Sequence, residues 1–216
     1  MSRPNLLKTD QHPYHVSSRC LDKRFFPLPM DKVWQIMLEQ LYVAHQKHHL
    51  RVHAFVLMGN HFHLLCQTPN QNLDEVMQVL LRSTSLSITR AAGLHGPIWS
   101  RYKWSLINAP SHYYQVYRYI LQNPLRAQLV DKVEAYPFSS LHQVPFPLCT
   151  HVPLSFGGQA GENLWLNERY TSEDLKLIRL GLRKFQFDVN QRLVKAFQRL
   201  SSPIEDQKKA PHEEGL

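Results

Sequence analysis

The strongest structural signal in this sequence is a hairpin pattern over residues 52–67 that carries two histidines on its second arm. Two largely apolar runs flank Gly59-Asn60, a dipeptide typical of two-residue turns between antiparallel strands. Polar and apolar residues then alternate, so His61 and His63 project from the same strand face. Imidazoles at this spacing can reach one cation. We interpret the pair as a candidate metal site, while two polar residues on a solvated sheet face would give the same pattern.

A second signal lies in residues 110–130, which have helical periodicity. Spacings of three or four residues align polar side chains along one stripe of the predicted helix, namely His112, Gln115, Tyr119, Asn123 and Arg126. Four tyrosines occur here, and most tyrosines in such a cluster pack against a core. Only Tyr119 is followed one turn later by a carboxamide, Asn123. Its oxygen suits a cation held by His61 and His63, which suggests a site for phosphodiester chemistry.

Several stretches of the sequence resemble the single-tyrosine HUH transposases of bacteria, and most closely their REP-associated branch. The matching stretches occur in the order of that family and cover roughly residues 12–142, with the agreement in residues 14–19, 56–65, 96–102, 117–127 and 136–140. One departure is Gly59, where the family commonly has proline; it concerns the turn and not the chemistry. The resemblance fades beyond residue 145, and nothing is carried over there.

The resemblance implies a mechanism as well as a fold. A divalent cation, Mg²⁺ or Mn²⁺, would be held by His61, His63 and Asn123, and Tyr119 would attack the scissile phosphate to give a 5′-phosphotyrosine and a free 3′-hydroxyl. No nucleotide cofactor is expected, since the sequence has no phosphate-cradling glycine loop. The proton acceptor for the tyrosine stays open between His112, Lys103 and the cation alone. Gln122 is a further auxiliary candidate.

The order of predicted elements agrees with the fold that the resemblance implies. It is a strand over 14–19, a helix over 30–48, the hairpin, a helix over 73–92, a strand over 104–108 and the helix over 110–130. We therefore expect a ferredoxin-like α+β fold whose antiparallel sheet carries its helices on one face. Residues 1–145 would form the nuclease domain. Residues 146–200 would form a helical extension, with a helix from Thr171 to about Phe187, and residues 201–216 a disordered tail.

The charge distribution favours a nucleic-acid partner over a basic surface that only aids solubility. Residues 1–130 hold 14 lysines and arginines against 6 acidic residues, whereas residues 131–216 hold 11 of each. Residues 99–104 interleave aromatic rings with cations, as surfaces that bind single strands do, although Trp99 and Trp104 fit a core equally well. The predicted partner is single-stranded or hairpin DNA. The predicted contacts are Arg19, Arg82, Arg101, Tyr102, Lys103, Arg118 and Arg126.

The remaining features of the sequence concern the cellular location of the protein, and two other functions stay open. The three cysteines, Cys20, Cys66 and Cys149, have no metal-ligand spacing, and no apolar run approaches a membrane span. We expect a cytoplasmic protein without a signal peptide, either a monomer or a homodimer. A DNA-binding module that has lost catalysis is one alternative. A metal-dependent hydrolase that activates water is the other, and it should survive replacement of Tyr119 by phenylalanine.

Overall fold

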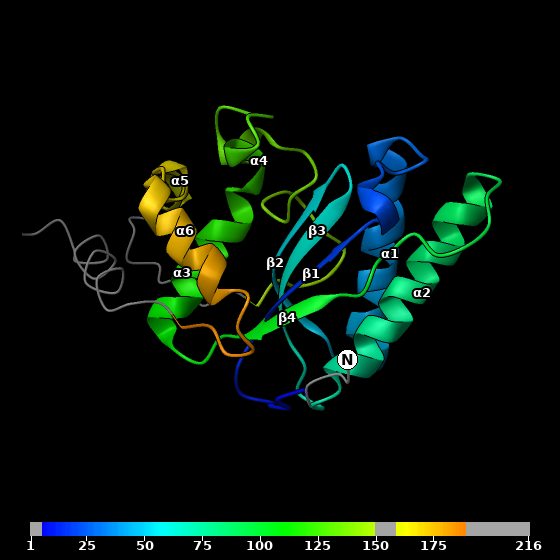
Figure 1. Ribbon diagram of the computed structural model, residues 1–216, viewed down its shortest axis with the longest axis horizontal. Coiled ribbons are helices and arrows are strands. Elements are labelled where there is room, and N and C mark those ends of the chain that lie inside the picture. The colour runs from blue at the N-terminus through cyan, green and yellow to red at the C-terminus, as the bar shows by residue number, and fades with distance from the viewer. Residues whose placement is uncertain (1–5, 150–158, 189–216) are drawn as a thin grey trace, which may run out of the picture.

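The computed structural model describes residues 6–149 and 159–188, and its centre is a four-stranded antiparallel sheet. The strand order is β2-β3-β1-β4, with β1 (Tyr14–Arg19), β2 (Arg51–Met58), β3 (His61–Gln67) and β4 (Lys103–Leu106). Two helices connect the strands, α1 (Met30–His48) between β1 and β2 and α2 (Leu73–Ala91) between β3 and β4. This β-α-β-β-α-β order is the ferredoxin-like topology. The predicted α+β fold is therefore confirmed (Figure 1).

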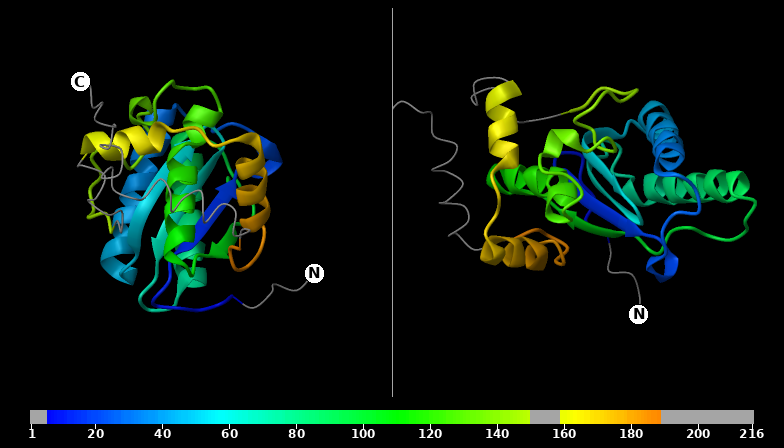
Figure 2. Two further views of the ribbon diagram at one scale, coloured as in Figure 1. Left: turned by 90° about the vertical axis from the view of Figure 1, so that its left-hand side faces the viewer. Right: turned by 90° about the horizontal axis from the view of Figure 1, so that it is seen from above.

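Helices cover both faces of the sheet, which corrects the expectation that they pack on one face. Helices α1 and α2 cover the face that bears Phe62 and Leu64, whereas α3 (Pro110–Leu121) covers the opposite face (Figure 2). The reason lies in β2, where all seven residues from Val52 to Met58 are buried. A strand buried on both sides requires cover on both sides. This run, which is apolar except for His53, was the sequence signal for a second helical layer.

The predicted helix over residues 110–130 is divided. Helix α3 ends at Leu121, and a single turn, α4 (Asn123–Arg126), follows after Gln122. Pro124 explains the break, because proline lacks the amide hydrogen that would continue the ladder and its ring clashes with the preceding turn. Two short 3₁₀ turns, η1 (Leu21–Lys23) and η2 (Val133–Ala135), complete this part of the chain.

The C-terminal helices pack on α3. Helices α5 (Gln159–Asn167) and α6 (Ser172–Gly181) bury Trp165, Leu166 and Ile178 against it. The predicted cap at Thr171 is present, since its hydroxyl accepts a hydrogen bond of 3.1 Å from the Asp174 amide.

Helix α6 ends at Gly181, well before Phe187, because the chain turns back toward the sheet. Leu106 of β4 accepts a hydrogen bond from the Phe187 amide and donates one to the Phe185 carbonyl, each 2.8 Å long. We call residues 185–187 the strap. The other predicted parts of the C-terminal region, residues 189–200 and the tail over 201–216, lie outside the described residues.

Within the two described ranges, no helix is both long enough and apolar enough to cross a lipid bilayer.

Candidate active site between the sheet and helix α3

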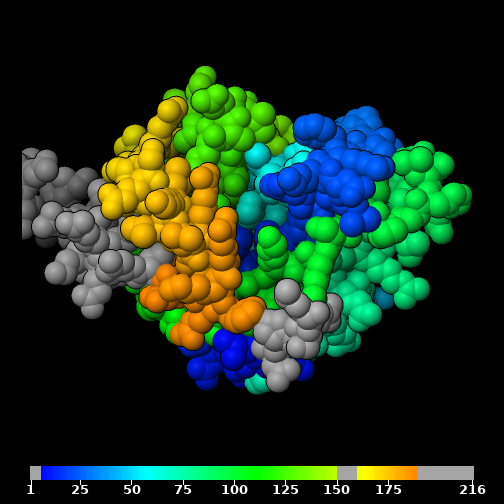
Figure 3. All heavy atoms as spheres, viewed as in Figure 1, coloured from blue at the N-terminus to red at the C-terminus, as the bar shows by residue number. Residues whose placement is uncertain are grey.

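A cavity of about 660 Å³ opens on the sheet face that α3 covers. The surface is hollowed between α6 and the segment that contains β1 and η1 (Figure 3). Four residues that the sequence analysis combined, His61, His63, Tyr119 and Asn123, all line this cavity. They come from β3, α3 and α4, so three elements meet at the predicted site.

Strand β3 presents the two histidines with perpendicular rings whose centroids lie 5.3 Å apart. The orientation of His61 follows from its neighbour Asn60. The Asn60 Nδ2 donates a hydrogen bond of 2.8 Å to the Lys23 carbonyl, which can only accept, so the Asn60 Oδ1 faces the His61 Nδ1, 2.8 Å away. The His61 Nδ1 must therefore carry the proton. Its Nε2 keeps the lone pair that a metal ion needs.

His63 has a different partner, His15 of β1, which the sequence analysis did not identify. The His63 Nδ1 and the His15 Nε2 lie 2.9 Å apart, and the two rings are nearly parallel, at an interplanar angle of 16°, with centroids 5.2 Å apart. One hydrogen links these two nitrogens when both rings are neutral. The signal for His15 is the period of two in β1, which puts it on the face of Ser17, the residue paired with His63.

All three imidazoles are held neutral by their surroundings. Burial lowers the pKa of His15 to about 3. Burial, reinforced by the charge of Arg19, lowers the pKa of His61 to about 4. The pKa of His63 is lowered by burial first and then by His15, His61 and the nearby arginines. Neutral imidazole is the form that binds a metal, so protonation would not compete with a metal at His61 and His63 at neutral pH.

Helix α3 places Tyr119 above these histidines. The Tyr119 ring lies edge-on to His63 and His15, with centroids 6.0 and 6.4 Å away. The Arg126 guanidinium lies over the Tyr119 ring, 4.1 Å from its centre, and donates a hydrogen bond of 2.8 Å to the Tyr119 carbonyl. The Asn123 Nδ2 donates to the carbonyls of Tyr119 and Ile120, so its Oδ1 remains available to the cavity.

The donor set fits a divalent cation. Two imidazole nitrogens and one carboxamide oxygen suit a borderline to hard ion such as Mn²⁺ or Mg²⁺ and leave coordination positions for phosphate oxygens. In the described part of the chain, no group of three or more histidine, cysteine and acidic side chains is placed to hold a metal. Among the residues that line the cavity, the carboxamide of Asn123 is the candidate third ligand beside the two histidines.

Basic side chains from separate segments surround the cavity. Arg19, Arg101 and Lys103 line it, as three of the predicted DNA contacts, and Asp22 is the acidic residue of the lining. Helix α6 adds Arg179, which sequence reasoning missed because α6 lies beyond the stretch that resembles the transposases. This excess of positive charge attracts a polyanion to the site.

Two of the predicted residues have structural contacts instead. Arg118 is 4% exposed, forms an ion pair of 3.4 Å with Glu168 and stacks on the Tyr170 ring at 4.1 Å. Gln122 donates hydrogen bonds to the carbonyls of Leu166 and Glu168, at 2.7 and 2.6 Å. Both residues fasten the α5–α6 connection to α3, and neither lines the cavity.

His112 and Arg82 also lie away from the cavity. The His112 ring packs edge-on against Phe187, with centroids 5.0 Å apart, and burial lowers its pKa. Arg82 belongs to α2, on the other face of the sheet, where it lines a separate cavity with Trp99. The structure thus gives neither residue a contact with Tyr119.

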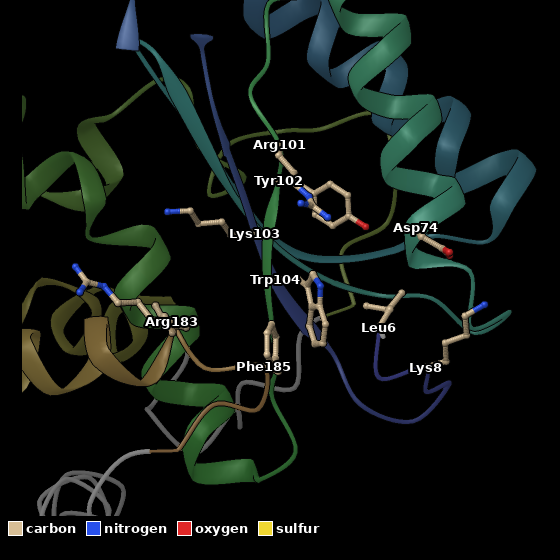
Figure 4. Close-up of a pocket in the computed structure, with 10 residues that line it drawn as sticks. Leu6, Lys8, Asp74, Arg101, Tyr102, Lys103, Trp104, Arg183 and Phe185 are labelled. Carbon is tan, nitrogen blue, oxygen red and sulfur yellow. The ribbon is translucent and has the colours of Figure 1, made fainter. Parts of the chain in front are cut away.

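A second hollow of about 700 Å³ follows the outer edge of β4, and we call it the edge groove (Figure 4). Tyr102 and Trp104 line it, while Arg101 and Lys103 line both this groove and the cavity that holds Tyr119. Trp99 is instead a core residue, since its ring is 6% exposed and its Nε1 donates to the Thr84 hydroxyl at 2.8 Å.

Comparison with solved structures identifies the fold. The chain is similar to a REP-associated tyrosine transposase bound to a REP hairpin, with a TM-score of 0.56 and 21% identity over 66% of this chain and 84% of that chain. A crystal structure of a candidate transposase from Deinococcus radiodurans R1 gives a TM-score of 0.36 and 15% identity over 60% of this chain and 91% of that chain, which is too distant to support an argument. No protein-family model and no curated protein matches the sequence.

Proposed function

We propose that this chain, which has the fold of a REP-associated tyrosine transposase, cleaves and rejoins single-stranded or hairpin DNA through a 5′-phosphotyrosine. The observation that carries the proposal is the convergence of Tyr119, His61, His63 and Asn123 on one basic cavity. The transposase of similar fold is bound to a REP hairpin, which supports DNA as the substrate class. Each of the four residues has a chemical task in this reaction.

The covalent step belongs to Tyr119. Its phenolic oxygen attacks phosphorus in line, the bond between phosphorus and the 3′ oxygen breaks, and the departing oxygen takes up a proton to become a 3′-hydroxyl. Attack by a 3′-hydroxyl on the phosphotyrosine reverses the step and rejoins DNA. Because the phosphodiester energy is kept in the covalent bond, the reaction needs no nucleotide cofactor.

Other residues bind and orient. When bound to His61, His63 and Asn123, Mg²⁺ or Mn²⁺ supplies positive charge to the scissile phosphate. Arg126 fixes the Tyr119 ring by lying over its face. Arg19, Arg101, Lys103 and Arg179 bind the phosphates that flank the scissile one. Neither side chain considered for the tyrosine proton is suited to accept it, because His112 does not line the cavity and Lys103 binds phosphate as an ammonium, which has no lone pair. The remaining candidate is the cation alone, whose charge would favour the ionised phenol.

The test is to trap the covalent intermediate. The protein is incubated with labelled single strands and hairpins in Mg²⁺ or Mn²⁺, and adducts are separated under denaturing conditions. Wild type and Tyr117→Phe should both form the adduct, whereas Tyr119→Phe should form none, because only Tyr119 of these two lines the cavity. A peptide map should find the DNA on Tyr119.

Other outcomes would identify the alternative functions. Cleavage that survives Tyr119→Phe without an adduct would mean that water is the nucleophile and the protein is a hydrolase. Salt-sensitive binding with neither cleavage nor adduct under any metal condition would mean a DNA-binding module.

A further inference from the structure

The C-terminal strap gives the region beyond residue 145 a role in this reaction. We propose that the edge groove binds one unpaired nucleotide next to the scissile phosphate, with its base stacked on Phe185 beside Trp104. The inference rests on the proposed function, because it takes single-stranded DNA as the substrate. It also goes further, since it assigns a binding site to residues outside the stretch that resembles the transposases.

The aromatic platform joins two distant parts of the sequence. Strand β4 is an edge strand of the sheet, and the strap is hydrogen-bonded to it at Leu106. This pairing brings the ring of Phe185 to 5.3 Å from that of Trp104, at an interplanar angle of 36° (Figure 4). Phe185 is 50% exposed, so part of its ring surface is open. An aromatic ring held at the surface by backbone pairing is suited to stacking with a base.

The charges beside this platform favour a polyanion over a peptide or a lipid tail. Four basic residues line the groove, Lys8, Arg101, Lys103 and Arg183, against the single acidic residue Asp74. Rings for bases beside cations for phosphates are the combination that single-strand-binding surfaces use. A duplex would keep its bases stacked inside and leave the rings unused.

The groove continues from the candidate active site. Successive residues of β4 point to opposite faces, so Lys103 lies opposite Ser17 on the face of the histidines and Trp104 lies opposite Val16 on the other face. Arg101 and Lys103 line both hollows. A strand that leaves Tyr119 along these two cations therefore passes over the edge of β4 and reaches the platform.

The experiment scans one DNA strand for the base that Phe185 contacts. The Tyr119→Phe protein is used so that binding is measured without cleavage, by fluorescence anisotropy with a strand in which a single abasic site is moved stepwise. We expect one position at which loss of the base weakens binding at least about fivefold, the lower end for a stacked base. Adding Phe185→Ala should weaken binding of the intact strand similarly and remove the extra penalty at that position.

Matched variants separate this effect from damage to the fold. Phe185→Leu keeps an apolar contact with Trp104 but lacks a π face, so it should behave as Phe185→Ala does. Tyr42→Ala removes an aromatic ring of 43% exposure from α1 that lines neither hollow, and should leave both measurements unchanged. Arg183→Gln should lower the salt dependence of binding, and Arg90→Gln on α2 should not.

The inference fails if Phe185→Ala keeps the position-specific abasic penalty, or if Phe185→Ala abolishes dimerisation and leaves DNA binding intact, which would make the groove an interface between copies. Adduct formation by the protein with Tyr119 intact is measured in parallel. If the adduct forms but Phe185→Ala leaves the abasic profile unchanged, only the proposal about the edge groove is overturned. Absence of the adduct overturns the proposed function instead.

Discussion

Hydrogen bonds decide which nitrogen each histidine of the candidate site offers to a cation. His61 has one tautomer, with the proton on Nδ1, because the Lys23 carbonyl fixes the orientation of the Asn60 carboxamide. The His15–His63 pair has two arrangements, since either ring can donate the shared hydrogen. Only donation by His63 leaves its Nε2 free for a metal. A metal on the His63 Nε2 therefore requires His15 to accept the shared hydrogen, and His15 can do so.

A substitution at His15 should show this effect in metal affinity. We expect His15→Phe to weaken Mn²⁺ binding by about 10- to 100-fold, as loss of a residue that orients a ligand usually does. His15→Gln should restore part of the affinity, because its oxygen can accept the same hydrogen. Single-strand affinity should stay unchanged in both. Calorimetric titration with Mn²⁺ measures the effect, and His53→Phe, which alters a buried histidine bonded to Tyr113, is the control. Equal weakening in the control would assign the loss to packing.

The sequence predicted those site residues whose geometry is local. His61 and His63 follow from the period of a strand, and Tyr119 with Asn123 from the turn of a helix. The same rules place Arg118 and Gln122 beside Tyr119, yet these two bind the α5–α6 connection. His112 likewise packs on Phe187. Their partners lie about 45 to 75 residues away, and no local pattern encodes such pairings.

At the scale of elements, the end of α6 lies close against the residues that follow it, Phe187 of the strap and Asp188. A Cβ at Gly181 would lie 2.9 Å from both the Asp188 carbonyl oxygen and the Phe187 ring. The strap can return to β4 because this position has no side chain. The sequence predicted the start of α6 from its capping residues, but its end depends on this tertiary contact.

A local explanation and a tertiary explanation predict opposite effects of Gly181→Ala on the stability of the protein. Helix propensity alone would stabilise the protein by up to about 1 kcal/mol. We expect a loss of about 1–3 kcal/mol instead, because the added methyl group overlaps backbone. Urea unfolding measures the sign, and faster hydrogen exchange at the Leu106 and Phe187 amides would locate the change at the strap. Leu180→Ala, at the exposed neighbouring position, should leave both amides protected. A gain in stability would contradict the contact.

At the scale of the whole molecule, helices cover both faces of the sheet, and three neutral histidines lie on the face that α3 covers. Their pKa values are lowered relative to about 6.5 in an unfolded chain. An unfolded chain therefore takes up protons more readily than the folded one below that pH. The stability from keeping these rings neutral is fully present above pH 6.5 and is lost as the pH falls toward 4.

We expect the urea midpoint to fall between pH 6.5 and 4.5 when metal is removed with a chelator. Each histidine contributes a slope of up to about 1.4 kcal/mol per pH unit. His15→Phe should flatten the dependence, because one of the three groups is gone. Unfolding curves at half-unit pH steps measure the slope. An identical slope in the variant would show that other groups cause the acid sensitivity.

The pairing register of β3 links folding to chemistry. Its alternate residues go to two destinations, Phe62 and Leu64 to the apolar core and His61 and His63 to the cavity. A slip of one residue in the hairpin would exchange the two sets, driving imidazoles into the core and a phenylalanine into the cavity. Such a mispaired chain would lose its core and its chemistry together. A compact misfolded form without activity is therefore disfavoured, because the same two-residue alternation determines both the apolar core and the cavity.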